Sequence, residues 1–338
     1  MQIKLHTFDL RLRHTFRISR EARNVQQNFV VELAQDGISG LGEATANSYY
    51  GMTIESMTNR LGSLRSELAA FRLETPEKFE AWLQEKLPNH PFLRCALDSA
   101  ANDWYGKKLR RPLYKVWGQE WHSNIPMTNY TVGIDEIETM IAKIKETPWP
   151  IYKIKLGTDQ DIEIIESLRQ HTNAIFRVDA NCAWSVEQTI EYSKILKKLG
   201  VEFIEQPLPA EQIEAMPEVY SKSALPLAAD ESCRVESDVE KCVGKFHIVN
   251  IKLVKCGGLT PARRMITKAK QLGMQVMTGC MTESSVGISA IAQLLPQLDY
   301  VDMDGALLLS NDPAKGVKIE NGKIEQPLKS GNGVALKE

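Results

Sequence analysis

Several features that would set a protein apart from ordinary globular chains are missing from this sequence. No apolar run approaches the roughly 20 residues that a membrane-spanning helix needs. The first 16 residues, MQIKLHTFDLRLRHTF, alternate like a strand and lack the apolar core and cleavage site of a secretory signal. Neither charge sign is in excess, since 41 Lys and Arg stand against 43 Asp and Glu, a formal net charge of -2. The sequence therefore predicts a cytoplasmic protein that binds neither membranes nor nucleic acid.

Cysteine pairs and glycine-rich phosphate loops are missing as well. The six cysteines form no C-x-x-C pair, so the sequence predicts free thiols rather than a zinc site or a disulfide framework. Neither G-x-G-x-x-G nor G-x-x-x-x-G-K occurs, which disfavours a doubly wound nucleotide-binding sheet.

The first 124 residues predict a domain of their own. Residues 2–13 and 28–46 have the alternation of strands, and Asp36 and Gly37 predict a turn within the second of these stretches. Helical periodicity follows over residues 54–71, 76–87 and 92–107. Strands followed by a block of helices are typical of a separate α+β unit.

Residues 125–321 show a different pattern, in which short apolar strands alternate with amphipathic helices. Eight strands are predicted, at IPMTNYTV, IYKIKLG, AIFRVDAN, VEFIEQPL, LPLAADES, IVNIKLVK, QVMTGCMT and DYVDMDGA. Equivalent positions from Lys155 to Asp302 are separated by 22 to 26 residues, which is the period of a (β/α)8-type barrel. No strong eighth helix follows the last strand, and we expect the tail, residues 322–338, to return to the first domain.

Carboxylates recur at the ends of the predicted barrel strands, where barrel enzymes carry their chemistry. Asp179, Glu205 and Asp230 end the third, fourth and fifth strands, which are neighbours, so the three side chains can converge. Three oxygen ligands that leave room for water and substrate suit Mg²⁺, whereas zinc would recruit His or Cys. Any one of them could instead cap a helix or lie at a solvated rim, but their occurrence at successive strand ends favours a metal site.

Lysines end two further strands. Lys155 ends the second strand and Lys252 the sixth, on opposite walls of an eight-stranded ring. One lysine could remove an α-proton from a substrate carbon and the other could return a proton to the opposite face, while Mg²⁺ stabilises the enediolate charge. Lys153 lies on the same strand face as Lys155 and would lower its proton affinity by like-charge repulsion. The simpler alternative is that Lys153 and Lys155 pair with Asp179 or Glu205.

At this point the sequence resembles a known family. YKIKLG, VDAN, IEQP, ADES and NIKLVKCGG, together with ALDSAANDWYGKKLRRPLYKVWG before the barrel, are similar to motifs of the muconate lactonizing subgroup of the enolase superfamily, above all its dipeptide epimerases. The resemblance implies an α/β fold, a modified TIM barrel of (β/α)7β type with an N-terminal α+β capping domain. It also implies that one Mg²⁺ binds the three carboxylates and that Lys155 and Lys252 are the acid/base pair. Lys255 lies in the following turn and receives no catalytic role.

The resemblance also implies a dipeptide substrate. Asp302 and Asp304, two residues apart on the predicted last strand, would bind its N-terminal ammonium group. The C-terminal carboxylate would lie on Mg²⁺, and the C-terminal residue would be epimerised. Further candidate substrate contacts are Thr131, Lys153, Cys280, Met281 and Thr282.

Substrate specificity is expected from the capping domain, whose loops at residues 16–27 and 46–52 would close over the dipeptide. Arg17, Arg20 or Arg23 could receive a glutamate side chain. However, Glu21 occupies the position where acidic-dipeptide epimerases carry their arginine, which favours a non-acidic, apolar second residue.

Other activities of the same subgroup are alternatives. They are L-Ala-D/L-Glu epimerase, o-succinylbenzoate synthase, N-acylamino acid racemase and muconate cycloisomerase. A catalytically silent metal-binding barrel is an alternative of another class. Barrels of this kind usually associate, so we also expect a homo-oligomer.

Overall fold

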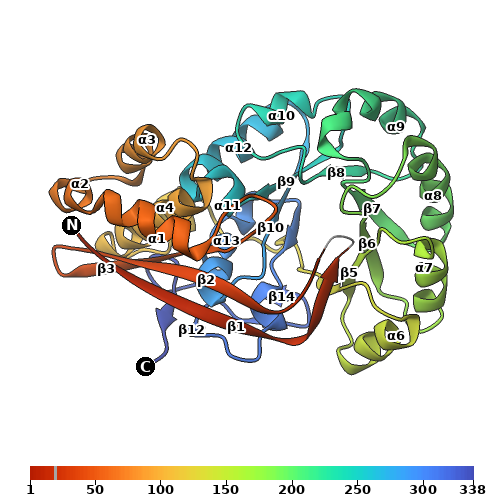
Figure 1. Cartoon of the computed structure of the whole chain (residues 1–338), viewed down its shortest axis with the longest axis horizontal. Coiled ribbons are helices and arrows are strands. Elements are labelled where there is room, and N and C mark those ends of the chain that lie inside the picture. Colours follow the sequence, from red (N-terminus) through yellow and green to blue (C-terminus); the bar gives the residue numbers. More distant parts are fainter. Residues whose placement is uncertain (19–20) are drawn as a thin grey trace.

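The computed structural model describes residues 1–18 and 21–338, which form an antiparallel sheet with helices beside a parallel barrel (Figure 1). The sheet consists of β1 (Gln2–Ile18), β2 (Glu21–Gln35) and β3 (Ile38–Thr45), in that order. The predicted turn is confirmed: Asp36 and Gly37 both have positive φ, 54° and 75°, and Gln35 pairs with Ile38. This two-residue turn matches the twist of the flanking strands.

The helices of the N-terminal unit lie close to their predicted positions. Thr53 and Ser56 form a capping box at the first of them, and a proline opens the third. The longest is almost wholly buried and packs against β3, with Gly40 and Gly42 of that strand in close contact with its backbone. The bounds are α1 (Ile54–Ser63), α2 (Arg65–Ala70), α3 (Pro76–Lys86), α4 (Pro91–Lys108) and α5 (Leu113–Val116).

Eight parallel strands form the barrel, as the sequence predicts. Neighbours in sequence are neighbours in the sheet, and a parallel bridge between Thr128 and Val301 joins the two ends of the row. The strands are β4 (Tyr130–Val132), β5 (Ile151–Lys155), β6 (Ile175–Asp179), β7 (Val201–Glu205), β8 (Leu227–Ala229), β9 (Ile248–Lys252), β10 (Gln275–Gly279) and β11 (Tyr300–Asp302). They are buried along most of their length because helices cover the outside (Figure 1).

The helices outside the barrel are α6 (Ile137–Glu146), α7 (Asp161–Arg169), α8 (Val186–Lys198), α9 (Met216–Lys222), α10 (Asp238–Lys241), α11 (Leu253–Cys256), α12 (Leu259–Gln271) and α13 (Ser285–Ala292). Both α11 and α12 lie between β9 and β10, so these helices occupy seven connections. After β11, the eighth strand, the chain forms a short 3-10 turn, η3 (Gly305–Leu308), in place of a further helix. The remaining strands are β12 (Ala314–Lys315), β13 (Ile319–Glu320), β14 (Lys323–Ile324) and β15 (Ala335–Leu336). The (β/α)7β prediction is thus confirmed.

The end of the chain contacts the N-terminal unit. Leu113 N donates to Gly331 O, and Asn332 N donates 2.7 Å to Asp103 Oδ1 in α4. These contacts agree with the expected return of residues 322–338, while the division into residues 1–124 and 125–321 stays a prediction.

The cysteines and the helix lengths bear on two of the predictions from the sequence. All six cysteines lie among the described residues and are free thiols. None of the helices that the structure describes combines the length and apolarity needed to cross a membrane.

Candidate active site

Three carboxylates converge at the carboxyl ends of adjacent barrel strands. Asp179 and Glu205 are the last residues of β6 and β7, and Asp230 directly follows β8. All three are buried, and an oxygen atom from each lies within 4.8 Å of an oxygen atom from each of the others. The convergence arises because parallel strands in register present their ends at one rim: Asp179 pairs with Glu205 across β6 and β7.

Two lysines flank this cluster from opposite walls. Lys155 ends β5 and Lys252 ends β9, four positions apart in the strand order. Lys155 Nζ lies 2.6 Å from Asp179 Oδ2, and Lys252 Nζ lies 2.8 Å from Asp230 Oδ2. Burial opposes charge on both carboxylates, but the lysines outweigh it and hold the pKa of Asp179 and Asp230 below the usual range. Burial likewise opposes charge on Lys252, but Asp230 outweighs it and raises the pKa of the lysine.

Lys153 lies deeper in the barrel than Lys155, on the same face of β5. Its side chain is 2% exposed, and Nζ contacts Glu205 at 2.8 Å, Asp302 at 2.9 Å and Asp179 at 3.1 Å. Burial opposes its charge, but these carboxylates outweigh burial and hold the pKa of Lys153 well above the usual value. The pairing alternative is therefore realised in the structure. The predicted effect of Lys153 on the proton affinity of Lys155 stays a prediction.

The charge balance of the site suits a divalent cation. Its carboxyl groups are those of Asp179, Glu205, Asp230, Glu231, Asp302 and Asp304, and its lysines are Lys153, Lys155, Lys252 and Lys255. When all six carboxyl groups are ionised, the four ammonium groups leave two negative charges, which one divalent ion would balance. Burial, the largest cause in both cases, raises the pKa of Glu205 and of Asp304 to about 7. Buried carboxylate oxygens without His or Cys at the triad fit a hard cation such as Mg²⁺.

Asp302 and Asp304 line the same cleft, although not from one strand. Asp302 ends β11, whereas Asp304 has φ -87° and ψ 0° at the start of η3, so the prediction that both lie on the strand is wrong for Asp304. The strand ends because the chain turns into the 3-10 helix. Asp302 accepts from Asn129 Nδ2 at 2.8 Å, and Asp304 Oδ2 accepts from the backbone N–H of Thr131. Both carboxylates are thus oriented by Asn129, directly before β4, and by Thr131 within it.

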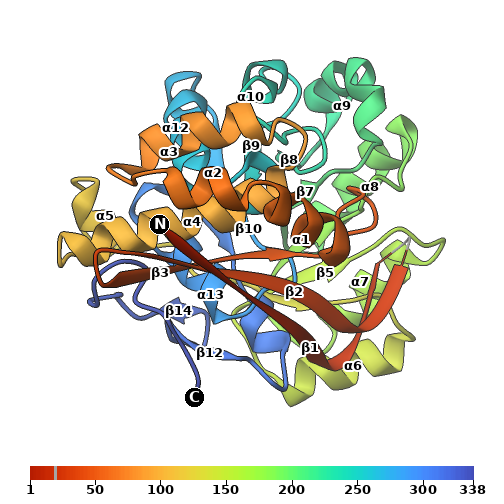
Figure 2. The same cartoon turned by 60° about the vertical axis from the view of Figure 1, so that its left-hand side comes forward.

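The capping domain covers the cleft. In Figures 1 and 2 the long β1–β2 ribbon extends from the N-terminal sheet toward the barrel near β5. Residues of this ribbon and of the segment after β3 line the cleft together with the lysines: Phe16, Ile18, Glu21, Arg23, Asn47, Tyr49 and Tyr50. The barrel side adds the predicted contacts Thr131, Cys280, Met281 and Thr282.

The arginines proposed for substrate recognition differ in position. Arg23 lines the cleft, and its Nη2 atom forms a close ion pair with Glu21. Arg17 is exposed, and it is not part of the cleft wall that the described residues form. Arg20 lies outside the described residues.

Comparison with known proteins is consistent with this geometry. The model of the mandelate racemase / muconate lactonizing enzyme N-terminal domain matches residues 2–118, and the enolase C-terminal domain-like model matches residues 136–338. The chain belongs to the enolase superfamily. An L-Ala-D/L-amino acid epimerase from Maribacter sp. is 57% identical over 99% of both chains. An L-Ala-D/L-Glu epimerase from Bacteroides thetaiotaomicron is 40% identical over 96% of this chain and 85% of its own.

This enolase-superfamily chain is also similar to a solved structure. The dipeptide epimerase from Cytophaga hutchinsonii, complexed with Mg and the dipeptide D-Ala-L-Val, superposes with a TM-score of 0.94 at 27% identity. The match covers 99% of this chain and 95% of that one.

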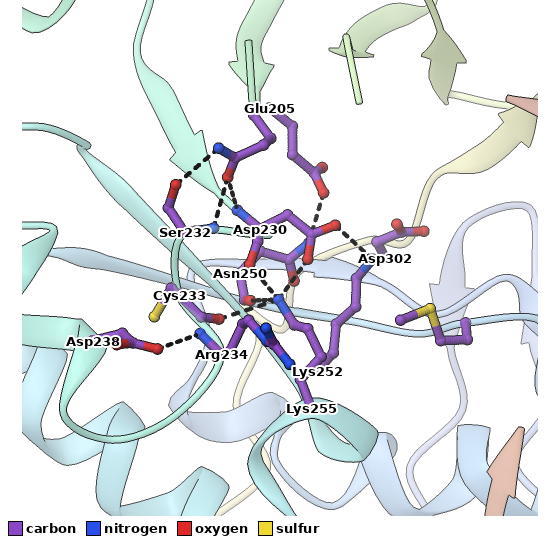
Figure 3. Close-up of polar contacts among 12 residues, drawn as sticks. Glu205, Asp230, Ser232, Cys233, Arg234, Asp238, Asn250, Lys252, Lys255 and Asp302 are labelled. Carbon is purple, nitrogen blue, oxygen red and sulfur yellow. Dashed lines mark hydrogen bonds and ion pairs between the residues drawn. The ribbon is translucent and has the colours of Figure 1, made fainter. Parts of the chain in front are cut away.

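Sequence reasoning gave no role to several residues that support the enolase-superfamily site. Asn250 Nδ2 donates 2.8 Å to Glu205 Oε1, and Lys255 Nζ lies 2.5 Å from Asp230 Oδ1 and 3.1 Å from Cys233 O (Figure 3). Asn250 stands two residues before Lys252, so strand periodicity could have placed it on the same face. Tyr50 lines the cleft from within the predicted capping-domain loop, residues 46–52, although the sequence did not single it out from its neighbours.

Proposed function

We propose that this chain is a dipeptide epimerase, an isomerase that inverts the α-carbon of the C-terminal residue of its substrate. The observation that carries the proposal is the pair Lys155 and Lys252, which end strands on opposite walls on either side of three converging carboxylates. A planar intermediate can be reprotonated on the second face only if a proton donor stands there. A cyclisation or elimination needs one base and has no such requirement.

Each group in the site then has a role. Asp179, Glu205 and Asp230 hold Mg²⁺, which when bound stabilises negative charge on the substrate carboxylate. Lys155 or Lys252 removes the α-proton, and the other lysine delivers a proton to the opposite face. Neutral lysine is needed for the first step, and a lysine in water has a pKa near 10.4. Lys153, on the same strand face as Lys155, contacts Glu205, Asp302 and Asp179.

Asp302 and Asp304 receive the N-terminal ammonium group of the dipeptide. Two carboxylates at the mouth, held by Asn129 and the Thr131 backbone, suit a cation with several N–H donors. The distance between this pair and the carboxylate triad then selects a substrate with an ammonium group at one end and a carboxylate at the other. A dipeptide satisfies both ends at once.

The second residue of the dipeptide is proposed to be non-acidic. The ion pair between Glu21 and Arg23 uses the guanidinium group on this wall of the cleft, and Arg23 also donates to Gln26 Oε1. The negative charge of Glu21 would repel a glutamate side chain, whereas apolar side chains would meet Phe16, Ile18 and Leu308. The name of the similar Maribacter epimerase covers amino acids in general and does not restrict the second residue to glutamate.

Epimerisation of Ala-Glu is the second candidate. It is favoured by the position of Arg23 on the cleft wall and by the similarity to the Bacteroides enzyme. A shift of the Glu21 side chain would free the guanidinium group for an acidic partner.

The test is a panel of L-Ala-L-X dipeptides incubated in D₂O with Mg²⁺ and followed by mass spectrometry and chiral chromatography. We expect one deuterium at the α-carbon and a mixture of epimers, with X apolar preferred over X = Glu, and no activity with a chelator present. Loss of a molecular fragment would instead indicate elimination, and a product of unchanged mass that is not an epimer would indicate cycloisomerisation. Glu21→Gln should shift the preference toward X = Glu by freeing Arg23, and the exposed Arg17→Gln is the matched control. The expected homo-oligomer is measured separately by light scattering.

A further inference from the structure

The stretch GLGEA in β3 places one carboxylate on the barrel side of the capping sheet. Gly42 lies so close to α4 that an added Cβ would come within 2.1 Å of Ala96 O. Side chains alternate along a strand, so Glu43 points away from α4. Its side chain is 2% exposed, and the adjacent helix α13 packs against β3. Leu41, on the same face of the strand, packs with Val286 of that helix.

Glu43 binds the beginning of α13 from outside the barrel domain. Oε1 accepts from Ser284 N at 3.0 Å, and Oε2 accepts from Ser284 Oγ at 2.7 Å and from Gly287 N at 2.8 Å. The first N–H groups of a helix have no partner within the helix, and their partial positive charge favours an anion. A carboxylate from another part of the fold therefore satisfies donors that the helix itself leaves open.

The same contacts hold a wall of the cleft. Met281 and Thr282 line the cleft and stand two or three residues before Ser284. Asn28, whose Nδ2 atom also donates to Glu43, donates 3.2 Å to Thr282 O. Glu283 Oε1 accepts from Met281 N at 2.8 Å. The backbone of residues 281–284 is thus held between the capping sheet and α13, with Glu43 at the centre of the network.

We propose that Glu43 is a positioning residue that holds the Met281–Thr282 wall against the dipeptide and so determines substrate affinity. The identity of the substrate, a dipeptide, rests on the proposed function. The hydrogen bonds of Glu43 are present in the structure whatever reaction the protein catalyses. The side chain of Glu43 contacts Asn28 in β2, Ser284 directly before α13 and Gly287 in α13, not the lysines or the carboxylate triad. Its loss should therefore weaken binding rather than the proton transfers.

The test compares Glu43→Gln with Glu32→Gln, the same change in the neighbouring strand, where Glu32 contacts His6 at 3.0 Å. A glutamine presents one NH₂ group in place of an acceptor, so at least one donor at the start of α13 loses its partner. Hydrogen exchange followed by mass spectrometry measures the loss of this hydrogen bond without any substrate. We expect exchange at residues 281–287 to rise about 10-fold or more in Glu43→Gln, because hydrogen bonds to charged groups are the stronger ones. Glu32→Gln should leave this segment unchanged.

Kinetics form the second arm. Glu43→Gln should raise KM for the best dipeptide about 10-fold while kcat changes less than about 3-fold, and Glu43→Asp should recover part of the loss. Unchanged hydrogen exchange at residues 281–287 would overturn the proposal. A roughly 10-fold fall in kcat with an unaltered KM would overturn it as well. If Glu43→Gln does not fold, Ser284→Ala removes one contact of the carboxylate and carries the same two expectations. If the wild type epimerises no dipeptide, the proposed function fails, while the exchange arm still decides the role of Glu43.

Discussion

The two carboxylates at the cleft mouth should respond differently to the loss of their charge. Asp304→Asn keeps the size of the side chain, and its amide oxygen can still accept from the Thr131 backbone N–H. The other oxygen of Asp304, 4.0 Å from the Cys280 thiol, becomes an NH₂ group that repels an ammonium group. Asp302 is bound more firmly, since its two oxygens accept from Asn129 at 2.8 Å and from Lys153 at 2.9 Å.

The expected changes in KM and kcat follow from these contacts. A hydrogen bond between charged groups contributes about 1.5–3 kcal/mol, so Asp304→Asn should raise KM roughly 10- to 150-fold. The turnover number should fall less than about 3-fold, because Asp304 has no contact with Lys155, Lys252 or the carboxylates of Asp179, Glu205 and Asp230 in the structure. Asp302→Asn should lower kcat as well, since Lys153 loses one of its three carboxylate partners.

The assay is the initial rate of epimerisation at pH 8, above the pKa of about 7 to which burial raises Asp304, so that the wild-type carboxylate is ionised. Asp299→Asn is the matched control, because Asp299 is exposed and binds Val276 N at the opposite end of the strand. An N-acetylated dipeptide removes the ammonium group from the other side of the contact. Wild-type KM values for Asp304→Asn, or equal rates on free and acetylated dipeptides, would refute the ammonium role.

Two further predictions concern other parts of the site. Lys252→Ala and Lys155→Ala should each stop epimerisation, because one face of the carbon loses its acid/base, while circular dichroism and Mg²⁺ binding remain; epimer formation by either variant, followed by NMR in D₂O, would contradict the two-lysine assignment. Glu283 has its pKa raised from the ordinary 4.5 to about 8, chiefly by burial and then by Glu43. At Glu283 the folded state therefore binds more protons than the unfolded state between these values, and the contribution of this residue to wild-type stability falls as the pH rises from 4.5 to 8. Glu283→Gln has no carboxyl group to ionise, so its free energy of unfolding should rise relative to that of the wild type across this pH range, by at most about 4 kcal/mol. Chemical denaturation at pH 5, 6.5 and 8 measures the gain, and parallel stability profiles for the two proteins would show that Glu283 is ionised in the fold.

Most of the fold and the centre of the site could be predicted from the sequence. Strand and helix periodicities are local, and so is the repeat of 22 to 26 residues that places Lys155, Asp179, Glu205, Asp230 and Lys252 at successive strand ends. In a barrel the strand order follows the chain order, so position along the sequence becomes position around the ring. That correspondence is why opposite walls could be assigned to the two lysines.

Tertiary packing decided the rest. Lys153 in β5 contacts Asp302 in β11, two strands away in the closed ring. Asp304 leaves the strand for a 3-10 turn, and Glu43 contacts Ser284, directly before α13, across 241 residues of chain. None of these contacts has a period or a local motif, because each depends on how the capping sheet meets the barrel and how the barrel closes. The sequence by itself determined which side chains stand at the rim. Only the folded structure decided which charges face one another there, because Coulomb and hydrogen-bond energies depend on distances that residue spacing does not contain.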